Sequence, residues 1–162
     1  MLGVDYSPQS VQLARRVAAE EEVAGNPLIV FEEWDVLNGD PATVLQHPDL
    51  PASIGEGGGF DVVLEKGTFD AISLSDEKDG KGRRLCEGYR ESVLPLVKKG
   101  TGLFVLTSCN WTEEELKSWF VTKEAEEDGD GFEVASRVEY RTFSFGGVKG
   151  QTISTLCFRR TG

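Results

Sequence analysis

Short apolar runs alternate with helix-forming segments over most of this chain, and that alternation constrains the fold more than any other feature. Strands are expected at 2–6, 28–37, 60–65 and 102–108. Apolar residues at helical spacing follow the first run, lie around 85–96, and follow the last run. Strands that alternate with helices are typical of an α/β protein whose sheet is mostly parallel.

The helix boundaries carry their own signals. Ser7 and Pro8 suit the N-cap and first position of a helix that continues to about Gly25. Thr112 and Glu115 have the spacing of a capping box, which predicts a short helix after residue 112. A polar loop is expected at 75–82.

The prolines and glycines of 38–59 predict irregular structure. Within this segment, GEGGG resembles a phosphate loop, but it precedes a strand and lacks the Lys-Ser/Thr ending. We therefore interpret GEGGG as a linker.

The C-terminal part of the sequence differs in kind. FEVASRVEY and QTISTLCFRR nearly alternate apolar and polar residues, and RTFSFGGVKG joins them. This pattern predicts a long antiparallel hairpin at the edge of the sheet. A chain of 162 residues suits one compact domain, so we expect a single domain over 1–162.

The net charge of −11 argues against nucleic acid as a partner, because phosphate binding needs clustered Lys and Arg. The acidity either keeps the protein soluble or attracts a basic protein substrate. No apolar run approaches the ~20 residues that a membrane helix needs. Three cysteines without CxxC spacing or a secretory signal predict reduced thiols and a cytoplasmic location. A metal site is not expected, since His47 is the only histidine.

Three acids, Asp5, Asp35 and Glu65, each stand at the C-terminal end of a predicted strand. Open α/β sheets bind ligands outside these strand ends, so we expect the three acids to meet at one edge. Asp5 could bind the hydroxyls of a ribose or simply cap the helix after it. Asp35 could accept the amine of an adenine or lie in a solvated turn.

The stretch Glu65-Lys66-Gly67-Thr68 separates two apolar runs, FDVVL and FDAISL. It could be an ordinary break after a strand, in which Gly67 adopts a conformation closed to other residues. The apolar residues on both sides must be buried, however, so the segment is expected to fold back over the sheet as a loop. We favour a functional site here.

Four segments together resemble class I methyltransferases that use S-adenosylmethionine, and resemble most the eukaryotic lysine methyltransferases of elongation factor 1-alpha. They are GVDYSPQSVQLA, EKGTFDAISL, TSCNWTEEEL and FSFGGVKG. The resemblance implies a Rossmann-like sheet and a soluble, monomeric enzyme. It also implies S-adenosyl-L-methionine as cofactor and elongation factor 1-alpha as protein substrate.

The resemblance assigns roles to individual residues. It implies that the cofactor is bound by Asp5, Tyr6, Asp35, Val36, Glu65, Lys66 and Gly67. It implies that the protein substrate is bound by Thr68, Asn110, Trp111, Phe143, Phe145 and Gly146. Packing inside the hairpin is the alternative role of Phe143. A catalytic base is not required, and Glu65 and Thr68 are the candidates if there is one. Glu65 stands where the family usually has aspartate, which lengthens its reach by one methylene.

The family's glycine-rich loop, E-x-G-x-G-x-G, does not occur in this sequence. We therefore expect an N-terminally truncated domain that lacks the first central strand and binds the cofactor weakly or not at all on its own. A narrowed sheet in which the flanking strands meet is the other possibility. A noncatalytic fragment or binding module of this fold and a small-molecule methyltransferase are the alternative functions.

Overall fold

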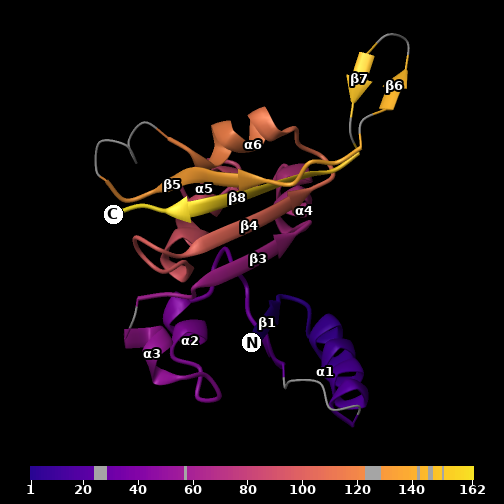
Figure 1. The fold of residues 1–162 in the computed structure, drawn as a ribbon. Coiled ribbons are helices and arrows are strands. Elements are labelled where there is room, and N and C mark those ends of the chain that lie inside the picture. The colour runs from indigo at the N-terminus through magenta and orange to yellow at the C-terminus, as the bar shows by residue number, and fades with distance from the viewer. Residues whose placement is uncertain (24–28, 57, 123–128, 142, 146–147, 151) are drawn as a thin grey trace. The chain divides into compact units, whose positions relative to one another are not determined.

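The computed structural model describes residues 1–23, 29–56, 58–122, 129–141, 143–145, 148–150 and 152–162 (Figure 1). Its contacts divide the chain into two compact units, Met1–Gly57 and Gly58–Gly162. The single domain expected over 1–162 stays a prediction.

The first unit contains a parallel strand pair. Strands β1 (Leu2–Asp5) and β2 (Val30–Glu33) are joined through helix α1 (Pro8–Val23), as the sequence predicts. The hydroxyl of Ser7 accepts a hydrogen bond from the backbone N–H of Ser10 at 3.3 Å, which caps this helix. Gly25, the predicted end of the helix, lies outside the described residues.

Strand β2 is shorter than the predicted strand 28–37, because the chain turns after Trp34. The carboxylate of Asp35 accepts a hydrogen bond from the backbone N–H of Leu37 at 2.9 Å, and its carbonyl accepts one from Gly39 at 2.7 Å. These bonds fold the backbone into a turn, and a turn cannot continue a strand ladder.

The prediction of irregular structure over 38–59 is wrong in part. Helices α2 (Pro41–Leu45) and α3 (Ala52–Glu56) occupy much of this segment. Asp40 caps α2 by accepting from the N–H of Ala42 at 2.9 Å, and Pro41 stands at the first helical turn. Proline favours that position because its missing N–H is not needed there, so it starts this helix rather than interrupting one.

The second unit is built on a four-stranded mixed sheet (Figure 1). Its order is β3 (Val62–Lys66), β4 (Leu103–Ser108), β8 (Ser154–Arg160) and β5 (Phe132–Arg137). β3 and β4 are parallel, whereas β8 pairs antiparallel with both β4 and β5. The mostly parallel arrangement of the α/β class and its antiparallel edge are therefore confirmed. Strands β6 (Phe143–Phe145) and β7 (Val148–Gly150) form a separate antiparallel pair.

Helices α5 (Leu85–Val93) and α6 (Glu113–Phe120) form where the sequence predicts them, and a short 3-10 helix, η1 (Leu94–Leu96), follows α5. The predicted capping box of α6 is present: Thr112 accepts from the N–H of Glu115 at 3.3 Å, and Glu115 accepts from the N–H of Thr112 at 2.9 Å. The loop expected after Gly67 is instead a helix, α4 (Thr68–Leu74).

The core of the second unit lies on one face of its sheet. On β4, Phe104, Leu106 and Ser108 are buried, whereas the residues between them are partly exposed. Phe104 contacts the ring of Phe120 from α6, with ring centroids 5.5 Å apart.

Among the described residues, no helix is both long enough and apolar enough to cross a membrane.

Candidate functional site at the carboxyl ends of the strands

Asp5 and Asp35 lie at the same edge of the first unit, because β1 and β2 are parallel neighbours, Asp5 is the last residue of β1 and Asp35 follows the end of β2. The Oδ1 atom of Asp5 accepts a hydrogen bond from the N–H of Ser7 at 2.8 Å. Asp5 is nevertheless exposed, and a carboxylate can accept several hydrogen bonds. Asp5 therefore caps a turn and keeps acceptor capacity, so both of its predicted roles remain open.

The neighbours of these acids differ in exposure. Tyr6 is 77% exposed, while Asp35 and Val36 are half-buried. Asp35 accepts from the side-chain amide of Asn38 at 2.8 Å, as well as from the backbone of its turn. Glu65 belongs to the other unit, so the meeting of all three acids at one edge stays a prediction.

Glu65 points inward and caps helix α4. Its side chain is 9% exposed, and Oε1 accepts from the N–H groups of Thr68 at 2.6 Å and Phe69 at 3.1 Å. Oε2 is buried and has no hydrogen-bond partner among the described residues. Burial raises the pKa of Glu65 from its ordinary value of 4.5 to about 7, against the opposing effect of the two backbone bonds.

Gly67 makes this capping possible. It stands at the N-cap position of α4 with φ of 82°, in the left-handed region that favours glycine. Since glycine has no side chain to cap the helix, the carboxyl group of Glu65 takes that role. Lys66 and Thr68, on either side of Gly67, are exposed.

A second buried polar cluster lies beside this turn, where β4 ends. Asp70 of α4 accepts from the hydroxyl of Ser108 and from the backbone N–H of Cys109, the latter at 2.8 Å. Asp70 and Ser108 are 9% and 1% exposed. Sequence reasoning missed both residues. The alternation along β4 places Ser108 on the buried face, and a buried hydroxyl needs a partner, so the signal was present.

The cluster supports two of the predicted site residues. Asn110 is exposed, and Trp111 is half-buried with its indole N–H donating to the hydroxyl of Ser73 at 3.1 Å. The ring of Trp111 lies 6.0 Å from that of Phe69 and 5.7 Å from that of Trp119, centroid to centroid. Trp111 thus packs against the core on one side while it lies at the surface.

The remaining predicted residues lie on the separate hairpin. Phe143 and Phe145 stand at the two ends of β6. The structure does not describe their side chains, and Gly146 lies outside the described residues. The roles assigned to these three residues stay predictions.

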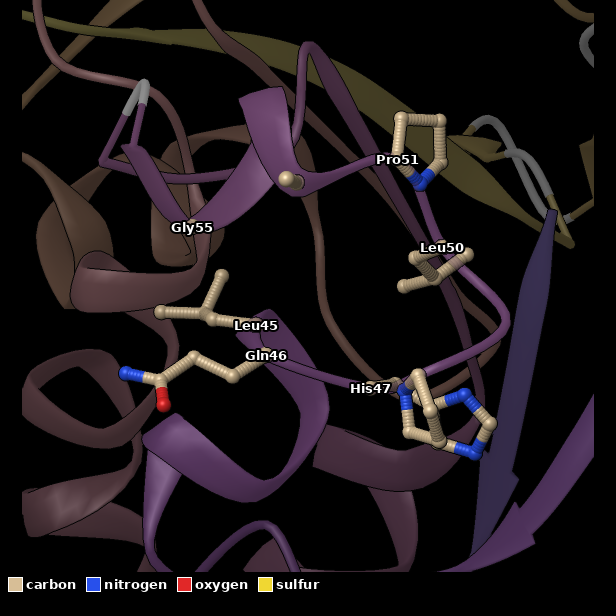
Figure 2. A pocket seen from close by; sticks show the side chains of 8 residues that line it. Leu45, Gln46, His47, Leu50, Pro51 and Gly55 are labelled. Carbon is tan, nitrogen blue, oxygen red and sulfur yellow. The ribbon is translucent and has the colours of Figure 1, made fainter.

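Figure 2 shows a pocket of about 470 Å³ in the first unit, lined by α2, α3 and the segment between them. His47 lines it, with Nδ1 accepting from the N–H of Asp49 at 3.3 Å and Nε2 3.7 Å from a carboxylate oxygen of Glu32. The residues that line this pocket include none of the predicted site residues. The pocket is therefore separate from the strand-end residues.

The curated proteins to which this chain is similar carry names of one kind, that of lysine methyltransferases. The chain is 34% identical over 158 residues to "Protein-lysine N-methyltransferase EFM4" of Saccharomyces cerevisiae, covering 98% of this chain and 58% of that protein. It is 34% identical over 161 residues to "EEF1A lysine methyltransferase 2" of Danio rerio, covering 99% and 57%. It is also 34% identical over 158 residues to the human protein of that name, covering 98% and 55%. The chain thus spans little more than half the length of these curated relatives.

No family model matches the chain. Among solved structures, a putative rRNA methylase from Clostridium thermocellum aligns with a TM-score of 0.49 at 9% identity, covering 99% of this chain and 72% of that one.

Proposed function

This chain is a homologue of the EEF1A lysine methyltransferases over nearly its whole length, and from this premise we propose that it forms part of a protein-lysine N-methyltransferase. The enzyme would use S-adenosyl-L-methionine and act on elongation factor 1-alpha. The observation that carries the proposal is the 34% identity over 98% of the chain. The resemblance expected from the sequence motifs is thereby confirmed.

The residues of the first unit fit the adenosine part of the cofactor. Asp5 is exposed at the end of β1, where a carboxylate can accept from both hydroxyls of a ribose. Asp35 lies at the same edge, at the end of β2, and would take the adenine amine with Val36 beside it. Tyr6, which is largely exposed, would lie against the adenosine.

The residues of the second unit would border the methionine part. Glu65 holds the turn at Lys66 and Gly67 by capping α4. We therefore propose that it shapes this border and does not contact the cofactor directly. Thr68 is exposed at the first turn of α4 and is available to a substrate. When bound, the cofactor supplies a methyl group on a positively charged sulfur.

Asn110 and Trp111 would position the lysine of the protein substrate. Methyl transfer is an in-line displacement that needs a neutral amine, so the protein must orient the lysine and exclude water. The aromatic face of Trp111 can hold the stem and the cationic form of a lysine, and Asn110 can hydrogen-bond to the partner. The lysine's proton would go to water. Of the two candidate bases, Thr68 is exposed, whereas Glu65 is buried and caps α4.

We also propose a cytoplasmic location and a monomeric state. All three cysteines, Cys86, Cys109 and Cys157, are free thiols, which suits a reducing compartment. A net charge of −11 supports a basic protein as the substrate and disfavours nucleic acid.

The test is methyl transfer from radiolabelled S-adenosylmethionine to purified elongation factor 1-alpha, at cofactor concentrations high enough to compensate for weak binding. We expect label in the protein band, and loss of most of it with Asp5→Ala. An Asp49→Ala variant, changed in an exposed loop of the same unit, is the control. Absence of label, or equal label with Asp5→Ala, would contradict the proposal.

A further inference from the structure

We infer that Asp70 and Ser108 are positioning residues: they hold the backbone of 108–111 in the one conformation that presents Asn110 and Trp111 to the protein substrate. The function of that presentation rests on the proposed lysine methyltransferase activity. The conformational part rests only on the hydrogen bonds of Asp70, Ser108 and Trp111.

Asp70 links helix α4 to the end of β4. One carboxyl oxygen accepts from the hydroxyl of Ser108, and the other accepts from the backbone N–H of Cys109 at 2.8 Å. Both oxygens are thus committed to this junction. The residue is buried, with 9% of its surface exposed.

Ser108 is the centre of the junction. Its hydroxyl donates to Asp70 and accepts from the backbone N–H groups of Asn110 at 3.1 Å and Trp111 at 3.0 Å. Together the two side chains therefore take up three successive backbone N–H groups, those of 109, 110 and 111. Because donors and acceptors are matched, this segment has one arrangement that satisfies all of them.

The indole of Trp111 fixes the far end of the segment. Its N–H donates to the hydroxyl of Ser73 at 3.1 Å, and that hydroxyl donates to the backbone carbonyl of Asp70 at 2.9 Å. The connections return to Asp70, so the segment is tied to α4 at its beginning and at its end. Asn110, between these ties, remains exposed.

This arrangement is more than a source of stability. An apolar pair would fill the same space, but it would leave the N–H groups of 109–111 without these acceptors. A polar cluster instead gives direction, since hydrogen bonds depend on angle as well as distance. The residues that it directs are the ones assigned to the protein substrate.

The test compares Asp70→Asn and Ser108→Ala with Thr107→Val in the full chain. Asparagine keeps the size of Asp70 but has only one acceptor oxygen, so it cannot accept from both the hydroxyl of Ser108 and the N–H of Cys109. Thr107→Val is the matched control. It removes a hydroxyl that hydrogen-bonds to the hydroxyl of Thr155 at 2.8 Å. Thr107 directly precedes Ser108, but its side chain lies on the opposite face of the sheet.

Two readouts separate the conformational part from the functional part. Amide hydrogen exchange should become at least tenfold faster at 109–111 in both cluster variants, with little change at Phe104 and Leu156. The Michaelis constant for elongation factor 1-alpha should rise at least tenfold while kcat and the constant for the cofactor change less than twofold. Thr107→Val should leave exchange at 109–111 and both constants unchanged.

Unchanged exchange at 109–111, or an acceleration that Thr107→Val reproduces, would overturn the inference. A fall in kcat without a rise in the Michaelis constant for the protein substrate would overturn it as well. Absence of methyl transfer by the unaltered chain would refute the proposed function, and the exchange result would still decide whether Asp70 and Ser108 set the segment.

Discussion

Replacing Glu65 by glutamine should remove most of the pH dependence that this side chain gives to the stability of the fold. Burial raises the pKa of Glu65 from 4.5 to about 7 in the folded chain, so between these values the folded state binds more protons than the unfolded state. Its contribution to stability is therefore complete below pH 4.5 and is lost as the pH rises through 7.

The magnitude follows from the two pKa values. A difference from 4.5 to about 7 corresponds to about 3 kcal/mol between the acidic and alkaline limits. Between about pH 5.5 and pH 8 the loss is about 2 kcal/mol, because part of it has already occurred at the lower pH. Glutamine does not ionise in this range. Its amide oxygen can still accept from Thr68 and Phe69, so helix α4 keeps its cap.

The assay is unfolding by denaturant at the two pH values, for the unaltered chain and for Glu65→Gln. Titration of all other groups cancels in the difference between the two proteins, which should change by about 2 kcal/mol in favour of glutamine on going to pH 8. Glu65→Ala is the control, because it removes the cap without adding a titratable group and should be about 1 kcal/mol less stable than Glu65→Gln at both pH values. If the difference between Glu65 and glutamine is the same at both pH values, Glu65 is not held protonated by burial.

Three further predictions test the second unit. Arg160→Gln should cost about 3 kcal/mol of unfolding free energy, because Arg160 is 12% exposed and makes two bonds to a carboxylate and two to backbone carbonyls. Arg159→Gln breaks only an exposed pair and should cost less than about 0.5 kcal/mol in the same unfolding experiment. Gly67→Ala and Gly82→Ala should each cost about 1 kcal/mol through strain at positive φ, since nothing lies within 4 Å of either added Cβ, and methyl-transfer assays should show loss of activity for Gly67 alone. Phe69→Ala should lower the free energy of unfolding by about 4 kcal/mol, because four aromatic rings contact this side chain; a loss below about 1 kcal/mol would contradict its place in the core.

The elements that the sequence predicted well have signals within a few residues of their boundaries. Ser7 and Pro8 start α1, and the Thr112 and Glu115 pair starts α6. The alternation in 154–160 marks β8 even though its partner β5 lies about twenty residues earlier in the chain. At both helices the side chains that start the element also satisfy its own backbone, so no distant contact is needed for the prediction. At β8 the pattern of side chains alone marks a strand.

Helix α4 was missed because its cap does not come from the cap position. Gly67 stands there without a side chain, and the acceptor comes from Glu65 in the preceding strand. From the sequence, an acid and a lysine before a glycine indicate a break after a strand. Only the register that buries Glu65 beside Leu106 turns its carboxyl group toward the N–H groups of Thr68 and Phe69.

In the candidate site, the sequence predicted exposed residues but missed the buried cluster of Asp70 and Ser108. Motif resemblance points to exposed residues such as Thr68 and Asn110, because these would meet a ligand. It does not point to Asp70 or Ser108. These two residues are 38 positions apart in the chain, and the packing of α4 against the end of β4 brings them together. A site of this kind depends on two sets of polar side chains. One set is exposed and open to ligands, and the other is buried and committed to the backbone that carries the first. A substitution in the buried set should therefore alter the geometry of substrate binding without removing any group that touches the substrate.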